Sequence, residues 1–131
     1  MHYSRLQAKE LSEKFAHHGQ VVLVDLAMRY GEPSTQQALE ALQAQGMERL
    51  LLLPLYPQYS ATTTASSFDE VFRVLGTWRN QPELRLVKHY HDNPAYITAL
   101  RDQVLSAWDK DGRPDFAAGD RLVMSFHGLP K

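Results

Sequence analysis

The feature that most constrains the fold is a regular alternation of short apolar runs with amphipathic helical patterns. The runs are rich in Val and Leu, which is typical of buried strands, and they lie at residues 21–27, 50–54, 84–88 and 122–126. A helical pattern precedes each run. Because each helix carries the chain back across a face of the sheet, we predict an α/β fold of the Rossmann-like, flavodoxin-like type. Its parallel sheet is expected to have helices on both faces, in three layers (α/β/α).

Capping motifs mark where the helices begin. A serine followed three residues later by Gln or Glu forms a capping box, and this pattern predicts helix starts at Ser4, Ser34 and Ser67. Asn93 followed by Pro94 predicts the N-cap and the first residue of a fourth helix. Apolar residues repeat at helical spacing on one face of the last two helices: Phe68, Val71, Phe72 and Leu75 in the third, and Ile97, Leu100, Val104 and Trp108 in the fourth.

Composition and charge exclude several classes of protein. Lys and Arg number 14 against 15 Asp and Glu, and the formal net charge of −1 does not suit a protein held to nucleic acid by a basic surface. The absence of cysteine excludes disulfides, thiolate catalysis and Cys-ligated Fe–S clusters within these 131 residues. No apolar stretch approaches the roughly 20 residues of a membrane span. We predict a single α/β domain over residues 1–131, with no nucleic-acid partner and no membrane span.

Aromatic and histidine side chains gather just after the four predicted strands. Open parallel sheets bind ligands beyond the carboxyl ends of their strands, so these positions matter most for function. Aromatic rings with polar tips suit a flat, largely apolar ligand. The alternative is that Tyr56 and Tyr59 simply pack beneath a loop. Three of the six histidines and four of the six tyrosines lie in the stretches 28–31, 55–60, 89–91 and 127–130.

Among these residues, His127 is the strongest candidate for chemistry. It directly follows a predicted strand, and Gly128 allows the backbone to turn tightly. An imidazole serves as a base near neutral pH or as a metal ligand. Arg29 follows the first predicted strand, where a guanidinium suits a ligand carboxylate as well as it suits a surface ion pair. His89 and His91 lie two residues apart, a spacing too common to indicate a metal site.

Three motifs follow the predicted strands in a fixed order. They are Met-Arg-Tyr-Gly-Glu-Pro-Ser at 28–34, Pro-Leu-Tyr-Pro-Gln-Tyr-Ser at 54–60 and Ser-Phe-His-Gly-Leu-Pro at 125–130. Together they resemble the motifs of ferrochelatases of the bacterial type, enzymes that insert ferrous iron into a porphyrin. The resemblance implies two similar Rossmann-like (chelatase-like) domains with the porphyrin in a cleft between them. It further implies that this chain covers most of the first domain, and that residues from about 122 onward begin the second.

The resemblance assigns roles to residues at matching positions. His127 maps onto the catalytic histidine, which is a proton acceptor, a metal ligand or both, and whose glutamate partner lies beyond Lys131. In animal members a cysteine ligand of a 2Fe–2S cluster follows the serine of the second motif, whereas this chain has Ala61 there, so no cluster is expected. The substrate-binding residues implied are Arg29, Tyr30, Tyr56, Pro57, Gln58, Tyr59 and Ser60, which line the porphyrin pocket.

By resemblance, the enzyme inserts Fe²⁺ into protoporphyrin IX or a related porphyrin and forms haem in the last stage of its biosynthesis. The expected partners are a porphyrin and ferrous iron as substrates, with no resident cofactor, and the expected location is the cytoplasm. The chain by itself is expected to be inactive and to self-associate. Two alternatives stay open. One is another tetrapyrrole metal chelatase, against which the loop at 56–60 argues; the other is a non-enzymatic flavodoxin-like ligand-binding module, for which the loop at 29–34 is a poor phosphate site.

Overall fold

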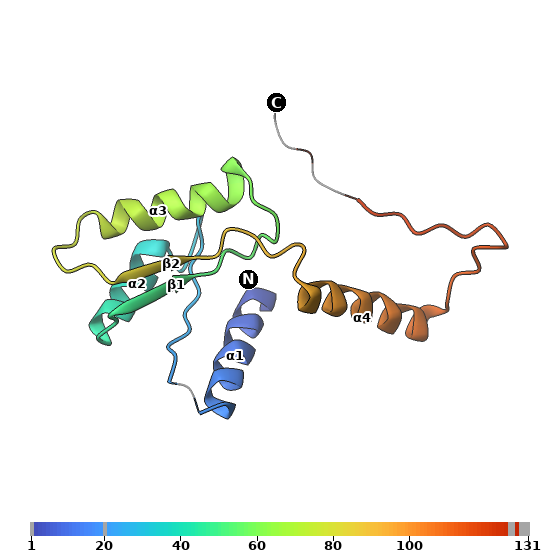
Figure 1. The fold of residues 1–131 in the computed structure, drawn as a ribbon, viewed down its shortest axis with the longest axis horizontal. Helices are drawn as coiled ribbons and strands as arrows, with labels where there is room; N and C mark the ends of the chain where they lie inside the picture. Colours follow the sequence, from blue (N-terminus) through green and yellow to red (C-terminus); the bar gives the residue numbers. More distant parts are fainter. Residues whose placement is uncertain (1, 20, 126–127, 129–131) are drawn as a thin grey trace. The chain divides into compact units, whose positions relative to one another are not determined.

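The structure, a computed structural model, describes residues 2–19, 21–125 and 128. The chain divides into two compact units, Met1–Tyr90 and His91–Lys131, of which the first holds the sheet. In chain order the elements are α1 (His2–His17), α2 (Thr35–Ala44), β1 (Arg49–Leu52), the π-helical turn η1 (Ala61–Ala65), α3 (Ser66–Leu75), β2 (Glu83–Leu86) and α4 (Pro94–Asp111) (Figure 1).

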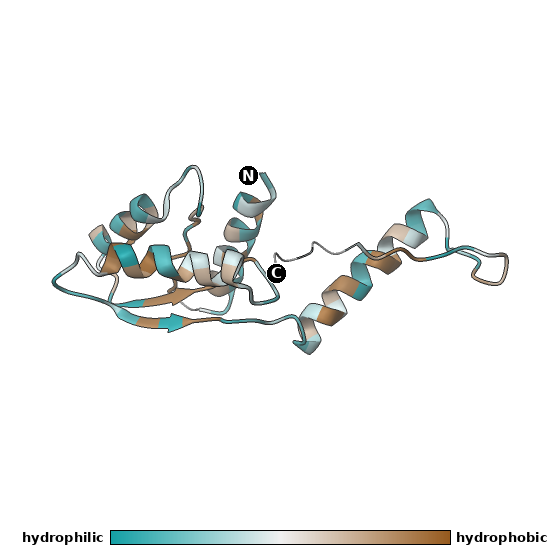
Figure 2. Ribbon diagram, turned by 90° about the horizontal axis from the view of Figure 1, so that it is seen from above, coloured by the Kyte–Doolittle hydropathy of each residue, from teal (hydrophilic) through white to brown (hydrophobic). Residues whose placement is uncertain are grey.

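Strands β1 and β2 form a two-stranded parallel sheet. Leu50 lies beside Leu84 and Leu52 beside Leu86, and Figure 2 shows apolar residues on both strands. Parallel strands need a crossover connection, which η1 and α3 provide. The structure therefore confirms the two middle predicted strands, their parallel pairing and the helix between them.

The core of the first unit lies between this sheet and helices α2 and α3. Both helices contribute to one buried cluster and contact each other, so they cover the same face of the sheet (Figure 2). On the opposite face, the Leu51 side chain is 60% exposed. In the part of the chain that the structure describes, the predicted three-layer arrangement with helices on both faces is therefore not confirmed. The cluster consists of Leu39 from α2, Leu50 from β1, and Val71, Val74 and Leu75 from α3.

Helix α2 begins where its capping box predicts. The Gln37 amide donates to Ser34 Oγ at 3.2 Å, and the Ser34 amide donates to the side-chain oxygen of Gln37 at 3.0 Å. The predicted start of the fourth helix is also confirmed, because Asn93 Oδ1 accepts a 2.9 Å hydrogen bond from the Ala95 amide and Pro94 is the first residue of α4. Both caps depend on contacts between near neighbours in the sequence, which is why the sequence alone locates them.

The capping boxes predicted at Ser4 and Ser67 are wrong. Helix α1 already begins at His2, so Ser4 lies inside it. Ser67 lies inside α3, where its hydroxyl donates to the Thr63 carbonyl at 3.0 Å. The π-helical turn η1 runs directly into α3, so the chain is already helical when it reaches this serine. A capping pattern inside a helix has no helix end to satisfy.

The strand predicted at 21–27 is not formed. Among the residues that the structure describes, no strand pairs with them, and Val21 is 99% exposed. The nearest β interaction is an isolated bridge between Met28 and Ser34, closed by a 2.8 Å hydrogen bond from the Met28 amide to the Pro33 carbonyl. An apolar, β-branched run becomes a strand only where a neighbouring strand satisfies its backbone hydrogen bonds.

The strand predicted at 122–126 is likewise absent in the part described. Residues 122–125 belong to no strand and Val123 is 85% exposed, while Phe126 lies outside the described residues. The domain boundary expected near residue 122 stays a prediction.

The apolar faces of the third and fourth helices also differ from those predicted. In α3, Val74 is buried and Phe72 is exposed, because the helix turns Val71, Val74 and Leu75 towards the core. Helix α4 has no buried residue. The apolar stripe of α4 is therefore present in the sequence but uncovered over Ile97, Leu100 and Val104.

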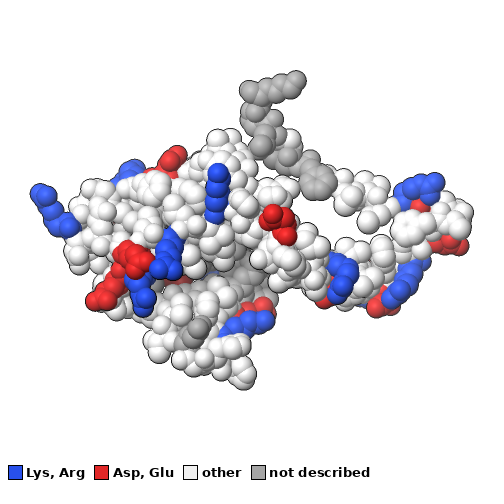
Figure 3. Space-filling model, in the orientation of Figure 1, with Lys and Arg blue, Asp and Glu red and all other residues white. Residues whose placement is uncertain are grey.

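On the face seen in Figure 3, acidic and basic side chains lie interspersed and form no extended field of one sign. Among the described residues, none of the helices combines the length and the apolar character needed to cross a bilayer.

Candidate functional site

The carboxyl ends of β1 and β2, beyond which we expect a ligand to bind, lie at one edge of the parallel sheet. Beyond the strands, the Val87 amide donates to the Leu52 carbonyl at 3.0 Å and the Tyr90 amide donates to the Pro57 carbonyl at 2.9 Å. The second hydrogen bond joins the two loops that follow the strands. It therefore brings together two of the stretches that the sequence analysis selected, 55–60 and 89–91.

The tyrosines of the first loop are available to a ligand. Tyr56 is 44% exposed and Tyr59 is 45% exposed, so neither is buried beneath a loop as the alternative interpretation required. Pro57 is half-buried and Gln58 is exposed. Ser60 is buried, and its hydroxyl lies 2.6 Å from the Thr63 hydroxyl. The loop thus presents two partly exposed rings on an anchored base.

The base of this loop is a π-helical turn that the sequence analysis did not predict. Ser60 is its N-cap, and the Ala65 amide donates to the Ser60 carbonyl at 3.1 Å. Thr64 is fully buried, and within the described residues its hydroxyl has no hydrogen-bond partner. Turns of this kind are rare and occur often at functional sites. The run Thr62-Thr63-Thr64 was the signal available in the sequence, but threonines near a helix start are ordinary caps.

Arg29 makes polar contacts with the first residues of α3. Its Nε donates to the Ser66 carbonyl at 3.0 Å and to Ser66 Oγ at 2.9 Å, and its Nη1 lies 3.8 Å from a Glu70 carboxylate oxygen. Ser66 is the first residue of α3, which follows the carboxyl end of β1. Of the two interpretations that the sequence left open for Arg29, the structure shows an ion pair.

Tyr30 is oriented by this arginine. The guanidinium carbon of Arg29 lies 4.6 Å from the centroid of the Tyr30 ring, within the range of a cation–π contact, and Tyr30 is 76% exposed. Arg29 therefore joins the loop that carries Tyr30 to the start of α3 while leaving the ring accessible.

Glu70 is the acceptor at the centre of a small charged cluster. Arg73 donates to its two carboxylate oxygens at 3.1 Å and 2.8 Å, and Arg29 Nη1 lies 3.8 Å from one of them. The pKa of Glu70 lies below its usual value, mainly because of the hydrogen bond from Arg73; burial opposes this shift, and the charges of Arg73 and Arg29 add to it. Ionised Glu70 therefore fixes Arg29 in place at neutral pH.

Lys88 is a second cation at this edge, and the sequence analysis did not select it. Its Nζ lies 4.9 Å from the centroid of the Tyr59 ring. Lys88 is the last residue of the third predicted strand, so its place at the carboxyl end of that strand was the signal that pointed to this edge.

The predicted catalytic and metal-binding residue, His127, lies outside the described residues. Its assignment stays a prediction. Of the histidines after the third predicted strand, His89 is exposed and follows β2 closely.

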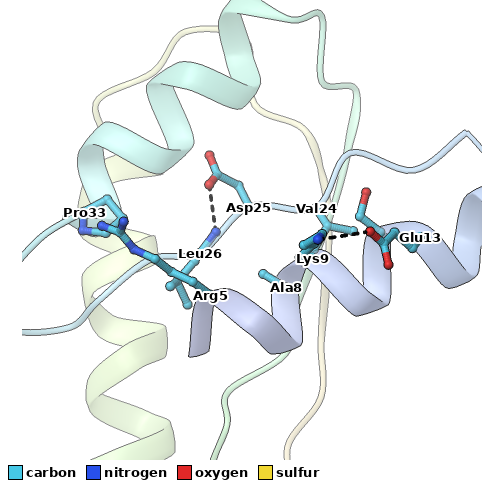
Figure 4. A pocket seen from close by; sticks show the side chains of 9 residues that line it. Arg5, Ala8, Lys9, Glu13, Val24, Asp25, Leu26 and Pro33 are labelled. Carbon is cyan, nitrogen blue, oxygen red and sulfur yellow. Dashed lines mark hydrogen bonds and ion pairs between the residues drawn. The ribbon is translucent and has the colours of Figure 1, made fainter. Parts of the chain in front are cut away.

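A separate pocket lies in the first unit between α1 and the extended segment that follows it (Figure 4). Lys9 and Glu13 form a 3.7 Å ion pair on its wall, and Asp25 accepts a 2.8 Å hydrogen bond from the Leu26 amide. Arg5 also lines the pocket, and none of the predicted site residues does. The pocket carries no functional assignment.

A protein-family model described as Ferrochelatase matches residues 1–131, the whole chain. No solved structure matches the chain.

Proposed function

The chain belongs to the ferrochelatase family, the lyases that insert a metal ion into a porphyrin, and from this we propose that the edge formed by β1 and β2 is part of its porphyrin site. The observation that carries the proposal is the hydrogen bond between Tyr90 and Pro57, which joins the two loops at the carboxyl ends of the strands. Tyr56 and Tyr59 stand partly exposed on one of these loops and supply flat apolar surface for a macrocycle.

The residue roles follow from what metal insertion requires. A divalent ion replaces two pyrrole N–H protons, so the site needs a base, a ligand for the metal and walls that hold the macrocycle. We propose that His127 supplies the base, the metal ligand or both, since a neutral imidazole does either near pH 7. Imidazole also suits ferrous iron as a ligand. The porphyrin contacts proposed are Tyr30, Tyr56, Pro57, Gln58, Tyr59 and Ser60.

The role proposed for Arg29 changes in light of its contacts. The resemblance places it in the porphyrin pocket, where a guanidinium suits a propionate group. Its Nε and Nη1 are committed to Ser66 and Glu70, so we propose that Arg29 is a positioning residue that orients Tyr30.

The substrates and setting proposed are those that the family resemblance implies. The metal is ferrous iron, the porphyrin is protoporphyrin IX or a close relative, and the reaction takes place in the cytoplasm. The enzyme needs no resident cofactor, and Ala61 supports the absence of a 2Fe–2S cluster of the animal type.

We also propose that the fold is of the three-layer, chelatase-like type, with helices on the second face of the sheet. The exposure of Leu51 on that face supports this, because parallel sheets are normally covered on both faces. Association between copies of this chain stays a prediction.

The test of the function is His127→Ala in the enzyme. Metal insertion, followed by absorbance with Fe²⁺ or Zn²⁺ under anaerobic conditions, should fall by at least the roughly 10²–10⁴-fold that a general base contributes. Porphyrin affinity, measured by fluorescence quenching, should stay close to that of the parent, because apolar walls supply most of the binding area.

Tyr30→Phe is the matched control for this test. It keeps the ring and removes one hydroxyl, so it should cost much less activity than the histidine substitution. Near-parental insertion by His127→Ala would show that another group, with the His89 and His91 pair the next candidate, performs the chemistry.

A further inference from the structure

Two cations contact the tyrosines of the proposed porphyrin site, and they differ in what else they bind. Arg29 lies against Tyr30 and Lys88 lies against Tyr59. A porphyrin with acidic side chains needs cations at its rim, because a carboxylate placed on an apolar wall loses hydration without compensation. The two cations are therefore the candidates for binding a porphyrin carboxylate at this edge.

Arg29 already makes contacts within the protein. Glu70 carries the opposing charge at 3.8 Å, and Ser66 accepts from the Nε at 3.0 Å and 2.9 Å. Only 30% of the Arg29 side chain is exposed. A substrate carboxylate that bound this arginine would share the guanidinium with Glu70, on a side chain whose Nε is already bound to Ser66.

Lys88 is in the opposite situation. It is exposed, and among the described residues no carboxylate forms an ion pair with its Nζ. Its one described side-chain contact is the Tyr59 ring, at 4.9 Å from the centroid. An ammonium group on an aromatic face keeps donors that point away from the ring, and its long stem lets it follow a ligand.

We propose that Lys88 binds a carboxylate of the porphyrin and is the charged specificity residue at this edge. The proposal rests on the function proposed above and extends it, because it names the group that recognises the acidic side chains of the substrate. A macrocycle that lies against Tyr59 brings its rim carboxylate to the adjacent ammonium group, where a charge-assisted hydrogen bond forms. Arg29 is not needed for this contact.

The experiment compares two probes on the whole chain. Protoporphyrin IX carries two carboxylates, and its dimethyl ester carries none, so the pair isolates the charge. Lys88→Met should weaken binding of protoporphyrin IX by roughly three- to tenfold, the range of a partly exposed charged contact, and leave binding of the ester unchanged. Lys88→Arg keeps the charge and should restore most of the affinity. Fluorescence quenching measures all of these values.

Arg79→Met is the matched control. Arg79 is an exposed cation in the connection that leads into β2, at the end of the strand opposite to the proposed site. The substitution removes one positive charge, as Lys88→Met does. Because Arg79 lies away from the proposed site, the affinity for both probes should stay unchanged. An equal loss with Arg79→Met would show a general charge effect and overturn the proposal.

The remaining outcomes are distinct. If the parent chain binds both probes and Lys88→Met binds protoporphyrin IX equally well, the inference about Lys88 is wrong and the proposed porphyrin site stands. If Lys88→Met loses affinity for protoporphyrin IX and for its dimethyl ester alike, Lys88 acts through Tyr59 and not on a carboxylate. That result also overturns the inference about Lys88. If the parent chain binds neither probe, the proposed site and the inference both fail.

Discussion

Residues 35–86 and the stretch at 21–27 contain similar apolar runs and reach different structures. In the first region, the run around Leu50 pairs with a second strand and is covered by α2 and α3. The other stretch has the composition of a strand, yet it pairs with no strand in the described part of the chain, and Val21 is almost fully exposed. The comparison shows that an apolar run marks a place where a strand is possible, while a neighbouring strand decides whether one forms.

The helices differ in the same way. Helices α2 and α3 bury residues against the sheet, whereas α1 and α4 bury none. Helix formation needs only hydrogen bonds within the segment, so α1 and α4 form without cover. Most of the stability of a helix in a protein comes from packing of its apolar face. Substitutions of buried residues in α2 and α3 should therefore lower the free energy of unfolding more than substitutions in α1 and α4.

The largest expected effect is a loss of stability confined to the buried region. Leu75→Ala removes a side chain that is 4% exposed and should lower the free energy of unfolding by about 2–5 kcal/mol, through lost burial and the cavity left behind. Leu122→Ala makes the same change at a side chain that is 53% exposed and should stay within about 0.5 kcal/mol of the parent. Urea unfolding followed by circular dichroism measures both, and equal losses would contradict the comparison.

A smaller effect separates the true helix cap from the one that sequence reasoning predicted wrongly. Ser34→Ala removes the hydroxyl that accepts from the Gln37 amide and should cost about 1 kcal/mol of stability. Ser4→Ala lies inside α1 and should change the free energy of unfolding by less than about 0.5 kcal/mol. If the two substitutions had the same cost, the capping box at Ser34 would contribute nothing of its own.

The smallest effect is a pH dependence localised to Glu70. The pKa of Glu70 is lowered in the folded state, chiefly by the hydrogen bond from Arg73, so ionised Glu70 stabilises the fold above its unfolded pKa of about 4.3. That contribution is lost as the pH falls through the lower folded pKa. Glu70→Gln should therefore flatten the decline in stability below about pH 5.

Arg73→Met is the partner variant, because it removes the main cause of the lowered pKa. Urea midpoints measured between pH 3 and pH 7 should show the same flattening for both variants. A parental slope in both would show that this pair does not govern the acid response.

The candidate site was only partly predictable from the sequence, because some of its contacts join residues that lie far apart in the chain. The sequence placed Tyr56 and Tyr59 in a loop after a strand, and the structure puts that loop beside the one that follows β2. Their role in binding stays a prediction, as does that of His127. The partners of Arg29 lie at Ser66 and Glu70, and the hydrogen bond to Ser66 spans 37 positions in the sequence. No local pattern identifies such a contact, and the same holds for Lys88 and Tyr59.

The sequence by itself determined two helix starts and the positions of two strands. It located α2 and α4 through their caps and placed β1 and β2 through their apolar runs, and its motifs agree with the family that the comparison found. The tertiary structure alone decided which apolar runs became strands, which helix faces were buried and whether Arg29 was available to a ligand. The physical reason is range: a cap joins residues three positions apart, whereas a strand or an ion pair across the fold needs a partner that only the packed chain brings near.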